Sequence, residues 1–144
     1  MIPRALYDVN MLIALFDPLH ARHASAHAWH GANGQHGWAS CPLTQNGLMR
    51  IMSHPRYASP QPLASMLHVV SEFSGDAAHT FWPDDVSLAA GGILAPQFAL
   101  TSSMLTDVYL LALAIKHEGR LVTLDSKIAR GAVIGATAMH LVIL

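Results

Sequence analysis

Three aspartates lie at the edges of apolar segments and could together form one functional site. Asp8 and Asp125 each follow a short apolar run, and Asp107 opens an apolar stretch with helical spacing. The chain has only nine acidic residues among 144, so three at the edges of core elements do not form a solvation pattern. Clustered carboxylates repel one another unless a cation lies between them, and Mg2+ and Mn2+ prefer oxygen ligands. The pattern predicts a metal-dependent phosphodiesterase.

Each aspartate also has a simpler interpretation. Asp107 shares a helical face with Leu110, Leu111 and Ala114, which places it on the buried side near the positive end of the helix. A first-turn aspartate often does no more than favour the helix dipole, and an aspartate after a strand often only caps a turn. In an open α/β sheet, however, the carboxyl ends of the strands form the usual binding crevice. Two aspartates there and a third at a helix N-terminus favour a common site.

The hydrophobic pattern predicts short strands that alternate with helices. The expected strands are 4–7, 37–41, 80–82, 120–124 and 139–143. The expected helices are 10–16, 18–30, 43–52, 60–73, 86–94 and 106–118. Three of the helix starts rest on the capping signals Asp17-Pro18, Ser59-Pro60 and Asp84-Asp85. Strands separated by helices predict a three-layer α/β/α sandwich with a mainly parallel central sheet.

Composition narrows the class of protein. The length predicts a single domain over residues 1–144. Hydrophobic residues make up 52% and charged residues only 12%. A parallel sheet covered on both faces would bury part of this excess of hydrophobic residues. The remainder could serve a partner or dimer surface. The net charge of −1 gives no long-range attraction for nucleic acid, so such binding requires a local patch.

Cysteine usage and hydropathy predict a cytoplasmic protein that does not enter a membrane. Cys41 is the single cysteine, which excludes an internal disulfide and favours a reducing compartment. Residues 1–4 lack the apolar core of a signal peptide. Segment 86–106 is uncharged but contains Gly91-Gly92 and the polar run 101–103. Such breaks are unfavourable in lipid, so this segment is expected to be a helix followed by a loop outside any membrane.

Four short motifs, taken in order, carry a family resemblance. They are Leu6-Tyr7-Asp8-Val9-Asn10-Met11-Leu12-Ile13-Ala14-Leu15, Leu43-Thr44-Gln45-Asn46-Gly47-Leu48-Met49-Arg50, Thr106-Asp107-Val108-Tyr109-Leu110 with its helix, and Leu121-Val122-Thr123-Leu124-Asp125. Supporting positions are His20, His23, Trp29 and Phe81-Trp82-Pro83. In these segments the sequence resembles the PIN-domain ribonucleases, specifically the VapC-like toxins of bacterial toxin–antitoxin pairs.

The resemblance implies a PIN-like α/β domain that acts as an endoribonuclease, a hydrolase of RNA phosphodiester bonds. It implies an Mg2+ or Mn2+ cofactor, a homodimer and a small cognate antitoxin that holds the toxin inactive. Asp8, Asp107 and Asp125 match the catalytic, metal-binding acids of the family. Asn10 and Thr123 match polar residues around that site.

The chain departs from the family pattern in one segment. Many members carry a glutamate at the start of the helix after the second strand, where this chain has Gln45 and Asn46. The sequence leaves open which of the two amides takes that position. An amide oxygen can bind a cation but adds no charge, which weighs against a tightly held second metal. The alternative function is a catalytically weak module that acts mainly by binding antitoxin or RNA.

The same residues bear on one other enzyme class and on contacts with substrate. A haloacid-dehalogenase-like phosphohydrolase would need a second aspartate two positions after Asp8, where the chain has Asn10. Arg50, Lys127 and Arg130 are candidates for contacts with substrate phosphates.

A histidine stripe could suggest a different metal. His20, His23, His27 and His30 follow one helical face, and the i, i+4 pair at its centre has the spacing of a zinc or nickel pair. A zinc site would need a third protein ligand, and none is obviously placed. We therefore expect a partly exposed row of neutral imidazoles.

One apolar stripe could serve either the core or a partner. Leu63, Met66, Leu67, Val70 and Phe73 lie on one face of the expected helix 60–73. The helix could form the wall of a groove for an antitoxin helix, apart from the surface of a homodimer. Periodicity alone leaves open whether the stripe is core or interface.

Overall fold

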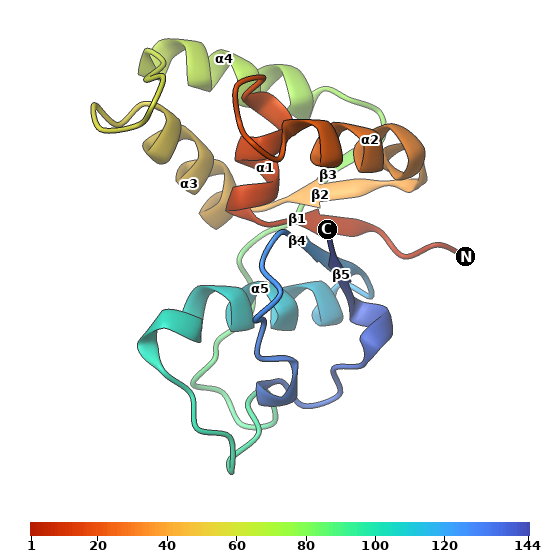
Figure 1. Cartoon of the computed structure of the whole chain (residues 1–144). Helices are drawn as coiled ribbons and strands as arrows, with labels where there is room; N and C mark the ends of the chain where they lie inside the picture. The colour runs from red at the N-terminus through yellow and green to blue at the C-terminus, as the bar shows by residue number, and fades with distance from the viewer.

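Five short strands form one sheet at the centre of the computed structural model, which describes all of residues 1–144 (Figure 1). The strands are β1 (Ala5–Tyr7), β2 (Trp38–Ser40), β3 (His79–Phe81), β4 (Arg120–Thr123) and β5 (Leu141–Ile143). Their order is β3-β2-β1-β4-β5, and every neighbouring pair is parallel. The predicted sheet is therefore confirmed, and it is wholly rather than mainly parallel.

Helices cover both faces of this sheet (Figure 1). They are α1 (Val9–Phe16), α2 (His23–Asn33), α3 (Pro42–Met52), α4 (Leu63–Ser74) and α5 (Leu105–Lys116). The first four lie on one face, and α5 lies on the other with the long segments before and after it (Figure 1). One apolar core fills each side of the sheet. The three-layer α/β/α sandwich is confirmed.

Two of the three predicted capping signals start their helices too early. Asp17 does not cap α2, which begins at His23; its carboxylate accepts hydrogen bonds from the backbone of Leu19 and the hydroxyl of Tyr57. Likewise α4 begins at Leu63 rather than at Pro60. A residue before proline is biased toward extended backbone, so Pro62 delays the start of the helix.

The helix predicted over 86–94 is absent. Its expected cap, Asp84, instead accepts hydrogen bonds from the backbone N–H of Leu43 at 3.0 Å and from the hydroxyl of Tyr109 at 2.9 Å. Asp85 lies 2.9 Å from the ring nitrogen of His117. Both carboxylates thus tie the loop to α3 and α5, and Gly91-Gly92 further disfavours helix. None of the helices has the length and apolar character that crossing a membrane requires.

The turn between α5 and β4 requires a glycine at position 119. Glu118, with φ 56°, takes the left-handed conformation that follows the end of α5. A Cβ on Gly119 would lie 2.6 Å from the carbonyl oxygen of Arg4. Glycine is needed here because β1 and the turn approach each other closely.

Candidate active site

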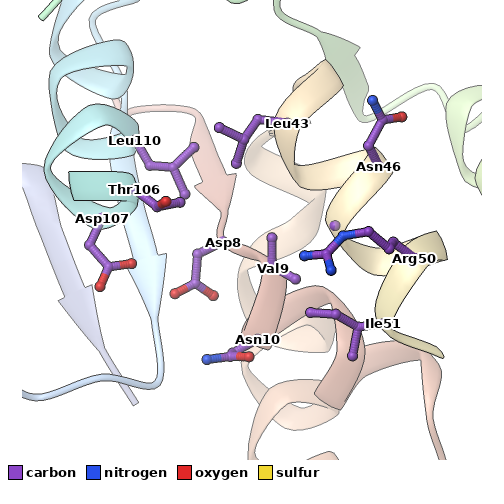
Figure 2. Close-up of a pocket in the computed structure, with 11 residues that line it drawn as sticks. Asp8, Val9, Asn10, Leu43, Asn46, Arg50, Ile51, Thr106, Asp107 and Leu110 are labelled. Carbon is purple, nitrogen blue, oxygen red and sulfur yellow. The ribbon is translucent and has the colours of Figure 1, made fainter. Parts of the chain in front are cut away.

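The three predicted aspartates gather at the carboxyl edge of the sheet. Asp8 directly follows β1, Asp125 follows the adjacent β4, and Asp107 lies in the first turn of α5. Asp8 and Asp107 line one cavity of about 530 Å³. Their carboxylates point toward the same space from opposite walls (Figure 2). Parallel topology explains the arrangement, because the carboxyl ends of neighbouring strands meet at one edge.

Asp8 is a buried acid that both caps a helix and lines the acidic cavity. Its Oδ1 accepts a hydrogen bond of 2.7 Å from the backbone N–H of Met11, so it caps α1. Asp8 is only 4% exposed, and this burial raises its pKa to about 6. The charges of Asp107 and Asp125 raise the pKa further, while hydrogen bonds from Thr123 and Met11 oppose the shift. Such a carboxylate is unfavourable without a compensating cation.

Asp107 and Asp125 share a second, adjoining cavity of about 270 Å³. Burial and then the charge of Asp125 raise the pKa of Asp107. Asp125 is exposed, and its Oδ1 accepts a hydrogen bond of 2.8 Å from the backbone N–H of Lys127. The three acids therefore influence one another, but they do not converge on a single point. No group of three His, Cys, Asp or Glu side chains forms a ready-made metal site.

The donor chemistry nevertheless fits a hard divalent cation. Asp8 and Asp107 present carboxylate oxygens to one cavity, and the amide of Asn10 lies beside them (Figure 2). Oxygen donors of this kind suit Mg2+ and Mn2+. A cation there would also offset the unfavourable ionisation that raises both pKa values. Asp125 would have to turn from its own loop to join them.

Thr123 holds two of the acids in place. It is fully buried at the end of β4, and its hydroxyl accepts a hydrogen bond of 3.0 Å from the backbone N–H of Asp125. The same side chain hydrogen-bonds Asp8. Residues that orient metal ligands in this way affect the site without touching the ion.

The two amides of α3 take different positions. Gln45 donates a hydrogen bond of 3.0 Å from Nε2 to the hydroxyl of Ser40 and does not line the acidic cavity. Asn46 lines the cavity, but its amide points away from the acids (Figure 2). The register that the sequence left open thus places Asn46 on the wall of the site.

The three basic candidates for phosphate contacts also lie in different places. Arg50 lines the acidic cavity, and its guanidinium extends from α3 toward Val9 (Figure 2). Lys127 lines the adjoining cavity with Asp107 and Asp125. Arg130 lines neither of these cavities. Two of the three predicted phosphate contacts are therefore placed beside the acids.

The sequence pattern gave no role to Gly47, which shapes the cavity wall. A Cβ at this position would lie 2.6 Å from Cγ2 of Val9, so glycine allows α3 to cross close to α1. Both residues line the acidic cavity. A glycine inside a helical pattern was the available signal for close packing.

The histidine stripe is only partly helical. His20 precedes α2, and its Nδ1 accepts a hydrogen bond from the backbone N–H of Arg22. His23 lies 2.8 Å from the carbonyl oxygen of Ala14, and His30 lies 2.7 Å from the hydroxyl of Tyr7. These contacts support structural roles. His23 and His27 are neighbours, with ring centres 5.5 Å apart, but no third ligand joins them.

The apolar stripe of α4 is divided between core and surface. Met66, Val70 and Phe73 are buried, whereas Leu63 and Leu67 are 54% and 53% exposed. The two exposed leucines line a groove of about 430 Å³ between α3 and α4. The buried part of the stripe is therefore core, and for the exposed leucines the partner surface stays a prediction.

Comparison with known proteins adds close relatives. No family model matches the chain. Ribonuclease VapC44 of Mycobacterium tuberculosis is 44% identical over 138 residues, which cover 96% of this chain and 97% of the relative. Ribonuclease VapC39 of the same organism is 39% identical over 133 residues, 91% of this chain and 95% of the relative. Ribonuclease VapC38 is 37% identical over 123 residues, 85% of each protein.

Proposed function

The chain belongs to the VapC family of ribonucleases, and on that basis we propose that it is the endoribonuclease toxin of a toxin–antitoxin pair, with one PIN domain over residues 1–144 and dependence on Mg2+ or Mn2+. One observation carries the metal dependence. Asp8 and Asp107 face the same cavity, and burial raises the pKa of each. Two acids held in this way favour a bound divalent cation.

Each residue has a distinct part in this proposal. A bound cation would activate water and stabilise charge on the scissile phosphate. Asp8 and Asp107 hold the cation, and Asp125 joins them from the adjoining cavity. Thr123 fixes the orientation of Asp8, and Asn10 hydrogen-bonds the carboxylates or water around the ion. Arg50 extends into the cavity, where it can neutralise a phosphate oxygen.

A cleavage assay tests the proposal. Purified protein is incubated with end-labelled single-stranded RNA in Mg2+, in Mn2+ and in chelator. Wild-type protein should cut only with metal, and Asp8→Asn and Asp107→Asn should each lower the rate at least about 100-fold. Glu72→Gln, which changes an exposed acid of α4, should cut at the wild-type rate. No cleavage with either metal, together with unchanged toxicity of Asp8→Asn in cells, would refute the nuclease assignment.

The uncharged side chain of Asn46 favours a second candidate function, a catalytically weak binding module. Of the two amides in the segment where many family members carry a glutamate, Asn46 is the one that lines the acidic cavity. A site with one acid fewer could bind RNA or antitoxin without rapid cleavage. Retained RNA affinity with no metal-dependent cutting would favour this weak module, whereas metal-dependent cutting would favour the nuclease.

The partner surfaces follow from the exposed leucines of α4. We assign the groove with Leu63 and Leu67 to an amphipathic antitoxin helix, because it is apolar and borders Arg50 of the acidic cavity. A short reading frame immediately upstream, ending in an amphipathic segment with a basic residue, would identify the partner. The homodimer is assigned to another apolar surface.

A further inference from the structure

A third cavity extends the acidic site along the end of α3. It measures about 260 Å³ and is lined by Arg50, Ile51, His54, Arg56 and Tyr57. Arg50 and Ile51 also line the acidic cavity, so the two cavities adjoin through shared walls. Both residues appear at the edge of the acidic cavity in Figure 2. The turn after α3 thus lies within reach of any chain that passes over the acids.

The arginines of this third cavity have no ion-pair partner within the protein. Arg50 and Arg56 form no ion pair, and Lys116 is the one Lys or Arg side chain of the molecule that does. The backbone N–H of Arg56 donates a hydrogen bond of 3.0 Å to Nδ1 of His54, which holds the turn. Two free guanidinium groups beside one cavity form the local basic patch that a chain with net charge −1 needs to attract an anion.

Ile51 and Tyr57 supply the apolar part of the wall, and a hydrogen bond fixes Tyr57. The hydroxyl of Tyr57 donates a hydrogen bond to Asp17, while burial and this carboxylate raise the pKa of Tyr57 to about 12. Tyr57 therefore remains a neutral phenol. With Ile51 it offers a surface on which a nucleobase could pack beside the arginines.

The cavities form a series. Asp107 joins the cavity of Lys127 to the central acidic cavity, and Arg50 joins the central cavity to the third one. Asp8 lines the central cavity, Asp107 and Asp125 line the cavity of Lys127, and the third cavity has arginines and no acid. A linear polyanion fits this arrangement better than a compact anion, because it can contact all three cavities at once.

We propose that the cavity lined by Arg50, Ile51, His54, Arg56 and Tyr57 binds a backbone phosphate of single-stranded RNA adjacent to the phosphate that is cut. This inference rests on the proposed ribonuclease function and adds a substrate subsite to it. Arg56 supplies a charge contact that does not involve the metal site, and Arg50 lies between the two phosphates. Contacts of this kind set affinity and position rather than base preference.

The test measures RNA binding separately from cleavage. Fluorescein-labelled single-stranded RNA is titrated with protein carrying Asp8→Asn, and anisotropy is recorded between about 50 and 200 mM salt. Added Arg56→Gln should weaken binding several-fold at the lowest salt and reduce the slope of log affinity against log salt by about 0.7, the value for one lost phosphate contact on a single strand. Arg56→Lys should retain the slope. Arg22→Gln is the matched control, since Arg22 lines none of the three cavities.

The outcomes separate this inference from the proposed function. An unchanged affinity and slope in Arg56→Gln would overturn the phosphate subsite even if wild-type protein cuts RNA. A reduced slope in a protein that never cuts RNA would keep the subsite and reject the nuclease. Weaker antitoxin binding by Arg56→Gln with an unchanged RNA slope would also overturn it and assign the cavity to the protein partner. Because Arg56 is exposed, the thermal midpoint of Arg56→Gln should match that of the parent protein carrying Asp8→Asn.

Discussion

Oδ1 of Asp8 accepts a hydrogen bond of 2.7 Å from the backbone N–H of Met11, so the carboxylate that faces the acidic cavity also caps α1. The two roles can be separated by substitution. Asparagine caps a helix about as well as aspartate but carries no charge, whereas alanine provides neither feature.

We expect Asp8→Asn to stabilise the metal-free protein at pH 7.5 by about 1–2 kcal/mol, because it removes a buried charge with a raised pKa. Asp8→Ala should be about 1 kcal/mol less stable than Asp8→Asn, because it also removes the cap. Chemical denaturation in chelator measures both. Mn2+ should raise the melting temperature of wild-type protein and have little effect on either variant. A metal-free Asp8→Asn protein that is less stable than wild type would contradict this account.

The raised pKa of Asp8 also predicts a pH dependence. The group titrates near 6 in the folded protein and near 3.8 when unfolded, so between these values the folded state binds more protons. Its contribution to stability is therefore most favourable below about pH 4 and is lost as pH rises through 6. The stability advantage of Asp8→Asn over wild type, measured by denaturation in chelator, should grow from pH 4 to pH 7. A constant difference across this range would show that Asp8 ionises normally.

The two amides of α3 predict different responses to added charge. Asn46→Glu should tighten Mn2+ binding several-fold, because position 46 lines the acidic cavity and the longer side chain can turn its carboxylate toward the acids. Gln45→Glu should leave the affinity nearly unchanged, because the wild-type side chain bonds to Ser40 outside that cavity. Isothermal titration calorimetry of both variants and the native form gives the comparison. Equal effects of the two changes would mean that the cavity does not distinguish the positions.

Gly47 and Gly31 form a matched pair of helical glycines. Gly47→Ala would place a Cβ 2.6 Å from Cγ2 of Val9, so it should destabilise the protein by about 1–3 kcal/mol and lower cleavage activity. Gly31→Ala has no atom within 4 Å of the added Cβ and should stabilise α2 by about 0.5–1 kcal/mol. Thermal unfolding of the two variants and the wild type measures both changes in stability. Similar shifts of the same sign would remove the proposed close crossing of α1 and α3.

The exposed leucines of α4 predict separable assemblies. Light scattering of the isolated chain should report a homodimer, and Leu67→Asp should keep that mass, because the groove is assigned to the antitoxin rather than to the dimer. The same variant should lose antitoxin binding in a co-purification assay. A strict monomer at high micromolar concentration would remove the dimer. Dissociation caused by Leu67→Asp would place the dimer contact in the groove instead.

The sequence by itself determined the succession of elements and the edge on which the acids lie. The spacing of hydrophobic residues predicts the strands and most helices. Because β1 and β4 are parallel neighbours, the residues that follow them lie close together. The shared edge of Asp8 and Asp125 was predictable for that reason, and Asp107 was predictable because it opens a core helix. The helix starts were less predictable because a capping residue can find another partner. Asp84, for example, bonds to Leu43 and Tyr109.

Only the tertiary structure decided which neighbouring side chains share a cavity. Gln45 and Asn46 are adjacent in sequence but point about 100° apart around α3, so packing against β2 and α1 assigns one to Ser40 and the other to the acidic cavity. The junction of three cavities through Asp107 and Arg50 likewise depends on how α3 and α5 lie across the sheet edge. Local sequence sets the direction of a side chain within its own helix, but long-range packing sets what that side chain meets.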